Sequence, residues 1–328
     1  TEMNLIREKL PQKTRGKVAV IGSGPAGLTV AGDLARQGFN VTIFEGQSEA
    51  GGVLMYGIPE YRLPKAVVTK EIQKIEALGV NFILNCLVGR DITIDQLFQQ
   101  GYDAIFIGTG TALPKDLNVP GNTLRGIVQS SYLLHMVTIF NQNIVSRDAV
   151  PMHEGDRVAV IGCGNVAMDA ARTAVRMGAS SVTVLYHRTE ADMSAIPSEY
   201  QEAVKEGVKF MWKTSTKEFL GDGDGKVTGI RAETPEGIQD LPFDCVLLAI
   251  GSRPANRIVS TTTGIEVDET GYVIVKERPY GMTTRRGVFA GGDVVHRPHT
   301  VVLAMKAAKQ VAAGIAQYVD AVKLLSIE

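Results

Sequence analysis

The sequence predicts an α/β protein made of two similar halves, with the second half inserted in the first, and three observations lead to this prediction. The segment VAVIGSGPAGLTVAGDLARQG (18–38) has a close counterpart in VAVIGCGNVAMDAARTAVRMG (158–178). In each copy an apolar strand, a glycine-rich turn and a stretch with helical spacing are followed by a second strand. The tail adds only a strand at 287–290 and a helix from about 300 to 318. We therefore expect the tail to return to the first half.

The glycine turns identify both halves as Rossmann-like dinucleotide-binding domains. The first glycine permits a tight strand-to-helix turn, the second lets the backbone approach a pyrophosphate, and the third allows close helix packing. These positions are Gly22, Gly24 and Gly27 in the first copy, and Gly162, Gly164 and Ala167 in the second. The expected domains are 1–112 with 253–328, and 113–252, joined by hinge loops at 113–121 and 251–255.

Hydrophobic periodicity and turn residues place the other elements. In the first half we expect strands at 18–21, 41–45 and 80–84, a further strand within 102–110, and helices at 25–37 and 67–78. In the second half we expect strands at 182–186, 209–212, 227–232 and 245–250, and a helix at 198–206. GDGDG (221–225) is interpreted as a plain turn, because it lacks the ligand spacing of a calcium loop.

Composition excludes several classes of protein. The chain has 328 residues, 45% of them hydrophobic, and a net charge of -1, with no basic run that would suit nucleic acid. No apolar stretch approaches the roughly 20 residues of a membrane span, and no signal peptide is evident, so we expect a soluble cytoplasmic protein. His296 and His299 have no neighbouring carboxylate or cysteine to complete a ligand set, so no metal site is expected.

The three cysteines, Cys86, Cys163 and Cys245, are far apart. No CxxC pair provides a redox-active dithiol, and no cysteine run could hold an iron–sulfur cluster. We expect three isolated buried thiols that behave as small hydrophobic side chains.

The residue that ends the second strand distinguishes the two halves. Glu45 fills this position in the first half, where a carboxylate can accept hydrogen bonds from a ribose diol. In the second half Tyr186 stands there, followed by His187 and Arg188. A cation pairs with a 2′-phosphate and a carboxylate repels it, so the second half is predicted to bind NADPH, with NADH as the alternative. The structural alternative is an ordinary surface arginine at a strand end.

Asp293 favours a flavin in the first half. A carboxylate after the Gly291-Gly292 turn can bind ribitol hydroxyls, and the helix that begins near Thr300 directs its positive end towards the flavin N1–C2=O region. The alternative is an aspartate that only caps a helix. Beside a duplicated nucleotide-binding fold, the flavin interpretation is preferred.

Taken together, the motifs of the chain resemble those of one protein family. GSGPAG with FEG, GIPEYRLPK, GTG, GCGNVAMDAAR, AIG and FAGGD are similar to the NAD(P)H-oxidising small (β) subunit of bacterial glutamate synthase, a module that also occurs in dihydropyrimidine dehydrogenase. The resemblance runs from about Lys17 to Tyr318 and implies a glutathione-reductase-like fold.

The resemblance and the motifs also imply site residues. The resemblance assigns FAD contacts to Ala26, Glu45, Val53, Arg62, Val88, Asp293 and Val301, beside Gly22, Gly24, Pro25, Gly27, Gly52, Gly110, Gly292 and Thr300 from the motifs. Contacts with the nicotinamide nucleotide are expected for Gly162, Gly164, Asn165, Val166, Ala167, His187, Arg188, Ala249 and Gly251.

Together these observations predict an oxidoreductase in which NADPH passes a hydride to N5 of FAD, whose electrons then leave singly. Members of the family usually carry a cysteine-rich cluster domain ahead of the first glycine turn. Because few residues precede Lys17 here, we expect no iron–sulfur cluster within this chain. The expected partner is a separate cluster domain or the glutamate synthase large subunit. The alternatives are a stand-alone ferredoxin or quinone reductase and a non-catalytic nucleotide-sensing module; a disulfide reductase is disfavoured by the missing CxxC pair.

Overall fold

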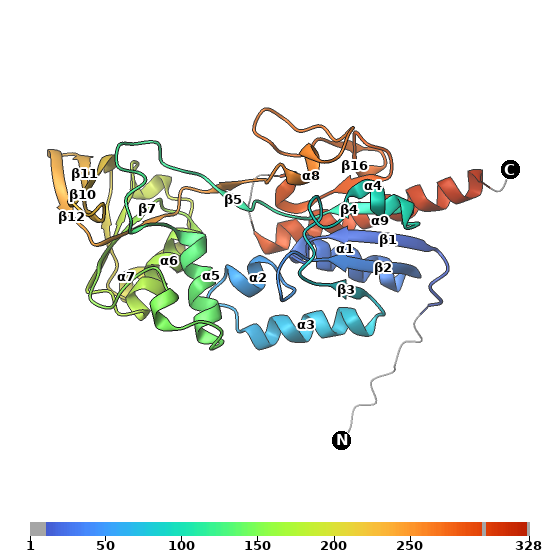
Figure 1. Cartoon of the computed structure of the whole chain (residues 1–328), viewed down its shortest axis with the longest axis horizontal. Coiled ribbons are helices and arrows are strands. Elements are labelled where there is room, and N and C mark those ends of the chain that lie inside the picture. Colours follow the sequence, from blue (N-terminus) through green and yellow to red (C-terminus); the bar gives the residue numbers. More distant parts are fainter. Residues whose placement is uncertain (1–10, 297–299, 327–328) are drawn as a thin grey trace, which may run out of the picture. The chain divides into compact units, whose positions relative to one another are not determined.

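The computed structural model describes residues 11–296 and 300–326 and divides the chain into two compact units (Figure 1). The first unit contains the residues up to Met55, Pro64–Leu113 and the chain from Arg253 onwards. The second contains Tyr56–Leu63 and Pro114–Ser252. The predicted α/β architecture, in which the second Rossmann-like domain is inserted in the first, is confirmed. The structure places residues 56–63 in the second unit and Leu113 in the first, whereas the sequence predicts the opposite for both.

The first unit is built on a seven-stranded sheet of order β15-β16-β17-β4-β1-β2-β3. Its parallel part contains β1 (Gly16–Ile21), β2 (Phe39–Phe44), β3 (Asn81–Ile83), β4 (Ala104–Ile107) and β17 (Val288–Ala290). An antiparallel edge is added by β15 (Val275–Glu277) and β16 (Tyr280–Thr283). All four residues of β4 are buried, as expected of a parallel strand covered on both faces.

Helices α1 (Pro25–Arg36), α4 (Ile94–Gln99) and α9 (Val301–Leu325) pack against this sheet (Figure 1). The first unit also contains α3 (Lys65–Ala77), α8 (Arg257–Ser260) and all but the last residue of α2 (Val53–Tyr56). Helix α1 begins with a proline, whose fixed φ suits the first helical turn, and ends before Gly38. Gly38 has a φ of 90°, the left-handed conformation that terminates a helix. Helix α1 packs against α9, so the tail completes the first unit.

The second unit repeats the plan on a five-stranded parallel sheet of order β6-β13-β7-β8-β9. Its strands are β6 (Ile127–Gln129), β7 (Arg157–Ile161), β8 (Ser181–Leu185), β9 (Lys209–Met211) and β13 (Cys245–Leu248). Its helices are α5 (Ser130–Asn141), α6 (Asn165–Arg176) and α7 (Pro197–Lys205). A three-stranded antiparallel sheet is added by β10 (Ser215–Gly221), β11 (Val227–Thr234) and β12 (Gly237–Pro242). The last four residues of β7 are buried in the core of this unit.

The chain passes between the units through two extended segments that pair with each other. These are β5 (Leu113–Pro114) and β14 (Ser252–Arg253), which form a two-stranded sheet. Both lie inside the loops that the sequence predicts as hinges. Within the part of the chain that the structure describes, no helix is both long and apolar enough to cross a bilayer.

Candidate functional site

The β1–α1 turn of the first unit is shaped by two glycines that admit no side chain. Gly22 has a φ of 93°, and a Cβ there would lie 2.7 Å from the Gly108 carbonyl oxygen. A Cβ on Gly27 would lie 1.9 Å from the carbonyl oxygen of Gly22. The first and third glycines therefore let the turn and helix α1 pack closely against the sheet, as the sequence predicts.

Gly24, the second glycine, has a different environment. A Cβ on Gly24 would have no atom within 4 Å, although its backbone lies beside Gly52, whose own Cβ would be 3.0 Å from the Gly24 Cα. The residue immediately precedes helix α1, whose first N–H groups have no partner within the helix. The open space in front of these donors fits a pyrophosphate group.

Glu45 is buried, 8% exposed, at the end of β2. One carboxylate oxygen accepts hydrogen bonds from the Ser23 backbone N–H (2.9 Å) and hydroxyl (2.5 Å), and the other accepts one from the Gln47 N–H (2.8 Å). The Ser23 hydroxyl also accepts a hydrogen bond from the Gly51 N–H at 2.9 Å. These hydrogen bonds fix the carboxylate at the carboxyl end of β2, where a Rossmann-like domain binds a ribose. Ser23 was not predicted, because it stands at a variable position of the glycine motif.

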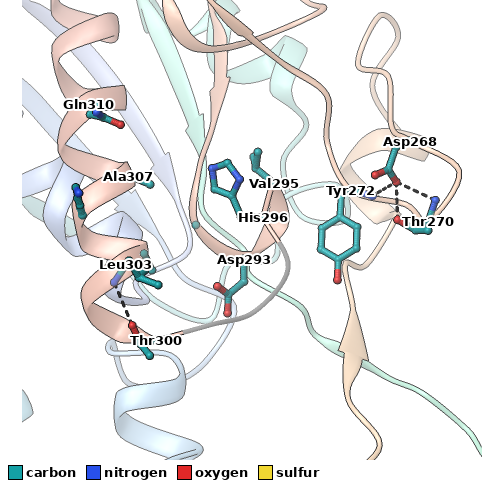
Figure 2. A pocket seen from close by; sticks show the side chains of 13 residues that line it. Asp268, Thr270, Tyr272, Asp293, Val295, His296, Thr300, Leu303, Ala307 and Gln310 are labelled. Carbon is teal, nitrogen blue, oxygen red and sulfur yellow. Dashed lines mark hydrogen bonds between the residues drawn. The ribbon is translucent and has the colours of Figure 1, made fainter. Parts of the chain in front are cut away.

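A pocket of about 610 Å³ lies at the start of helix α9 (Figure 2). Asp293 and Thr300, both predicted, line it together with Tyr272 and Asp268, which were not. The Thr300 side chain caps the helix by accepting a hydrogen bond from the Leu303 N–H at 3.3 Å. Asp268 is held by hydrogen bonds from the N–H groups of Thr270 and Tyr272 and from the Thr270 hydroxyl. A carboxylate and the positive end of a 25-residue helix therefore face one pocket of cofactor size.

Most other predicted FAD residues also belong to the first unit. A Cβ on Gly292 would lie 2.8 Å from the Ala26 Cβ, so the Gly291-Gly292-Asp293 turn meets the start of α1. The remaining positions are Pro25 at the first position of α1, Val53 exposed at the start of α2, Val88 buried, Gly110 with open space around it, and Val301 at the first position of α9. Their contacts with FAD stay predictions.

Arg62 lies in the second unit instead. Its Nη1 donates to both carboxylate oxygens of Asp169 on α6, at 2.7 and 2.8 Å, and its Nε lies 3.2 Å from a carboxylate oxygen of Glu199. Glu199 also pairs with Arg172 at 2.9 Å. Burial raises the pKa of Asp169 to about 6, although the hydrogen bonds from Arg62 oppose the rise. The guanidinium thus fastens residues 56–63 to α6, and its predicted contact with FAD stays a prediction.

The β7–α6 turn repeats the glycine pattern of the first turn, with alanine in place of the third glycine. Gly162 has a φ of 116°, and a Cβ there would lie 2.4 Å from the Ala249 carbonyl oxygen. Ala167, in the third position, is fully buried. A Cβ on Gly164 would approach the Ser194 hydroxyl at 3.3 Å, and the Ser194 N–H donates to the Cys163 carbonyl.

A loop is held across this second turn. The Asn165 side-chain oxygen accepts a hydrogen bond from the Ile196 N–H at 2.8 Å, whereas Val166 is 48% exposed. Gly251, beyond β13, has a φ of 93° and follows Ala249. The predicted residues of the second unit therefore gather at the carboxyl ends of β7, β8 and β13, where open α/β sheets bind ligands.

His187 and Arg188 follow β8 and are both exposed. Arg188 is in no ion pair among the described residues, although its positive charge helps to lower the pKa of Asp192. The Asp192 carboxylate accepts hydrogen bonds from the Thr189 N–H (3.2 Å) and hydroxyl (2.6 Å). Arg188 is thus available to an anionic ligand, and its contact with a 2′-phosphate stays a prediction.

The cysteines are separate thiols. Cys163 and Cys245 are buried and Cys86 is half-buried, so two of the three match the expectation of full burial. Burial raises the pKa of Cys163 to about 11 and that of Cys245 to about 12, which disfavours the reactive thiolate. Within residues 11–296 and 300–326, no group of three or more metal-ligating side chains gathers.

Comparison with known proteins identifies relatives that match most of the chain. The family model for pyridine nucleotide-disulphide oxidoreductases matches residues 16–308. A glutamate synthase [NADPH] small chain from Halomonas elongata is 37% identical over 94% of this chain and 69% of its own length. The beta subunit of an NADP(+)-dependent formate dehydrogenase from Moorella thermoacetica is 39% identical, but this chain spans only 44% of it. The predicted resemblance to glutamate synthase small chains is confirmed.

Solved structures with low sequence identity share the fold. FprA from Mycobacterium tuberculosis (a His57Gln mutant) superposes with a TM-score of 0.80 at 17% identity, covering 95% of this chain and 86% of FprA. Thioredoxin reductase from Lactococcus lactis gives a TM-score of 0.72 at 24% identity, covering 93% of this chain and 99% of the reductase.

Proposed function

Because this chain belongs to the pyridine nucleotide-disulphide oxidoreductase family, we propose that it oxidises NADPH, bound to its second unit, with FAD, bound to its first unit, as the immediate hydride acceptor. It is an NAD(P)H-dependent flavoprotein oxidoreductase similar to glutamate synthase small chains. The observation that carries the proposed assignment is the pair of glycine turns. A buried carboxylate, Glu45, follows one of them, and an exposed cation, Arg188, follows the other.

The first unit binds and orients FAD. The N–H groups at the start of α1 hold the pyrophosphate beside Gly24, and Glu45, fixed by Ser23, accepts a hydrogen bond from the ribose. Asp293 would hold the ribitol chain, and the start of α9 would supply positive charge that stabilises the reduced flavin. Bound FAD supplies the hydride acceptor and the capacity to release electrons one at a time.

The second unit binds the nicotinamide nucleotide. The N–H groups at the start of α6 face the pyrophosphate at Gly164, and Arg188 pairs with the 2′-phosphate. The buried, isolated thiols take no part, because each of the two with a high pKa is protonated at neutral pH.

The electron acceptor belongs to a partner. Relatives are named as a glutamate synthase small chain, a formate dehydrogenase beta subunit and the beta subunit of an NADPH-Fe(3+) oxidoreductase from Geobacter sulfurreducens. Each name implies a larger assembly, and this chain spans 44 to 69% of these proteins. We therefore place the acceptor, an iron–sulfur group, on a partner subunit or an adjoining cluster domain.

Reciprocal valine substitutions test the assignment of cofactors to units. Gly24→Val fills the open space in front of α1, and Gly164→Val adds a side chain before α6, where a Cβ lies 3.3 Å from the Ser194 hydroxyl oxygen. Gly24→Val should yield colourless protein without FAD that still binds NADP⁺, whereas Gly164→Val should stay yellow and lose NADP⁺ binding. FAD content is measured by absorbance after denaturation, and NADP⁺ binding by calorimetry.

Gly223→Val is the matched control, because it adds the same side chain in the β10–β11 turn, where a Cβ also has no atom within 4 Å. This control should retain both cofactors. If Gly24→Val kept its FAD, or if each valine abolished the binding of both cofactors, the assignment would be refuted.

A further inference from the structure

We infer that Lys213 is a second cation of the NADPH site, which binds the nucleotide 2′-phosphate together with Arg188. The inference rests on the proposed function. Lys213 lies in the loop after β9, so the sequence motif at the end of β8, which indicates Arg188, does not indicate Lys213. Four features of the second unit support it: backbone pairing, backbone conformation, the charges around Arg188 and the packing of the preceding residue.

The loops after β8 and β9 remain paired beyond the ends of the strands. The parallel strands are in register at Leu185 and Met211. Beyond them, the Thr214 N–H donates to the Tyr186 carbonyl at 2.9 Å, and the Lys213 N–H donates to the Arg188 carbonyl at 2.8 Å. The backbones of the two cationic residues therefore lie side by side at the carboxyl edge of the sheet, where a Rossmann-like domain binds its nucleotide.

Lys213 has an unusual backbone conformation. Its φ is 53°, in the left-handed region that residues with a Cβ seldom adopt. Among the described non-glycine residues, the others with positive φ are Asn85 and Asn143, and asparagine tolerates this region well. A lysine side chain gains no comparable local hydrogen bond, so the preference of the residue type does not explain this conformation. We attribute it to the position that it gives Lys213 beside Arg188.

The charge of a 2′-phosphate is larger than the charge of Arg188 alone, so a second cation is expected near Arg188. The pKa of Asp192 is lowered first by hydrogen bonds from Thr189 and then by the positive charges of Arg188 and His187. A phosphate monoester carries a charge of roughly −1.5 to −2 at pH 7, which the single positive charge of one arginine does not neutralise. Lys213 is exposed and forms no ion pair within the described chain, so its ammonium is available for this charge.

Aromatic packing fixes the residue before Lys213. The Trp212 ring stacks on Phe210, with centroids 5.4 Å apart, and meets Tyr186 edge to face at 6.2 Å. Tyr186 directly precedes the His187-Arg188 pair. The loops that carry the two cations are thus joined by side chains as well as by backbone, so Lys213 and Arg188 are held together before the ligand arrives.

Calorimetric titration with two redox-inactive nucleotides tests the inference on the full chain. Adenosine 2′,5′-bisphosphate carries the 2′-phosphate and 5′-AMP lacks it. Lys213→Ala should weaken binding of the bisphosphate about tenfold, the loss of one charge-assisted contact, and change binding of 5′-AMP less than about twofold. Lys209→Ala is the matched control, because Lys209 is an exposed lysine at the opposite end of β9, and it should change neither affinity.

The possible results separate this inference from the proposed function. No change in bisphosphate affinity in Lys213→Ala, an equal loss for both nucleotides, or a loss of the same size in Lys209→Ala would overturn the role of Lys213. So would a wild-type protein that binds the two nucleotides equally. If the selective loss is found but NADPH does not reduce bound FAD, the Lys213 site stands and the proposed hydride transfer fails.

Discussion

At the scale of the residue, Arg157 and Asp244 show how a single ion pair links the second unit's stability to pH. The Arg157 guanidinium donates two hydrogen bonds to the Asp244 carboxylate, each 2.8 Å long, and the Arg157 N–H adds a third at 2.9 Å. These contacts, above all the side-chain hydrogen bonds, lower the pKa of Asp244 to about 2. The folded-state pKa is thus below the ordinary value of 3.8. The pair therefore stabilises the fold above about pH 4, and the stabilisation is lost as the pH falls towards 2.

Asp244→Asn should lower the free energy of unfolding at pH 7 by about 1 kcal/mol, since both side chains are partly exposed and solvent screens the pair. The difference should shrink at pH 3. Urea unfolding followed by the fluorescence of Trp212, the single tryptophan, measures it. Asp240→Asn, which removes an exposed partner of Arg231, is the control and should have little effect. A loss of the same size at both pH values would contradict the expected pKa.

Single residues of the candidate site differ in how far the sequence predicts them. Glu45 and the glycines are predictable because their motif fixes their geometry. Ser23 is not, because serine is only one of the residues that the turn admits, and its hydrogen bond to Glu45 appears only in the folded chain. Tyr272, which lines the pocket at α9, and Lys213, which we propose as a second cation, are missed for a similar reason: each lies in a loop whose own sequence carries no motif.

At the scale of the element, residues 56–63 join the second unit although both flanks belong to the first. Tyr61 and Arg62 hold the segment to the second unit. The Tyr61 ring lies under the guanidinium groups of Arg172 and Arg176, at 4.7 and 4.0 Å, and Arg62 pairs with Asp169. Charged and cation–π contacts with α6 thus help to fasten the segment, and the buried Tyr56 ring adds a stacking contact with His135 on α5.

Arg62→Ala should lower the free energy of unfolding of the second unit by about 3 kcal/mol, because it leaves the buried Asp169 without this partner. Urea unfolding followed by Trp212 fluorescence detects the loss. Arg90→Ala, which removes an exposed partner of Asp91, should leave the free energy of unfolding almost unchanged, because solvent screens this pair. If the two variants were equally stable, the ion pairs of Arg62 would not hold the segment.

Elements with a strong apolar pattern are predictable, and others are not. The buried strands and α1 and α6 follow from their periodicity. Helix α5 is missed because SSYLLHMVTIFN is apolar on most sides and its N-cap, Gln129, makes no side-chain capping bond. Helix α4 is short, yet the Thr93–Gln96 capping box that begins it is a usable signal. Residues 56–63 could not be assigned, because the partners of Arg62 lie more than 100 positions along the chain.

At the scale of the whole molecule, the chain has two nucleotide-binding units with different chemistry. The repeated segment predicts both units. The tail contains only a strand and a helix, so it is expected to return to the first unit, which makes the second unit an insertion. The first unit presents Glu45 and the pocket at α9, whereas the second presents Arg188 and Lys213. This division suits one electron-accepting and one electron-donating cofactor within a single polypeptide.

Anaerobic titration of the FAD-loaded protein with NADPH tests this division most directly. One equivalent of NADPH should remove the visible flavin absorbance of one FAD per chain. NADH should need a higher concentration for the same rate, because it lacks the 2′-phosphate. A flavin that stays oxidised in excess NADPH under argon would contradict the account.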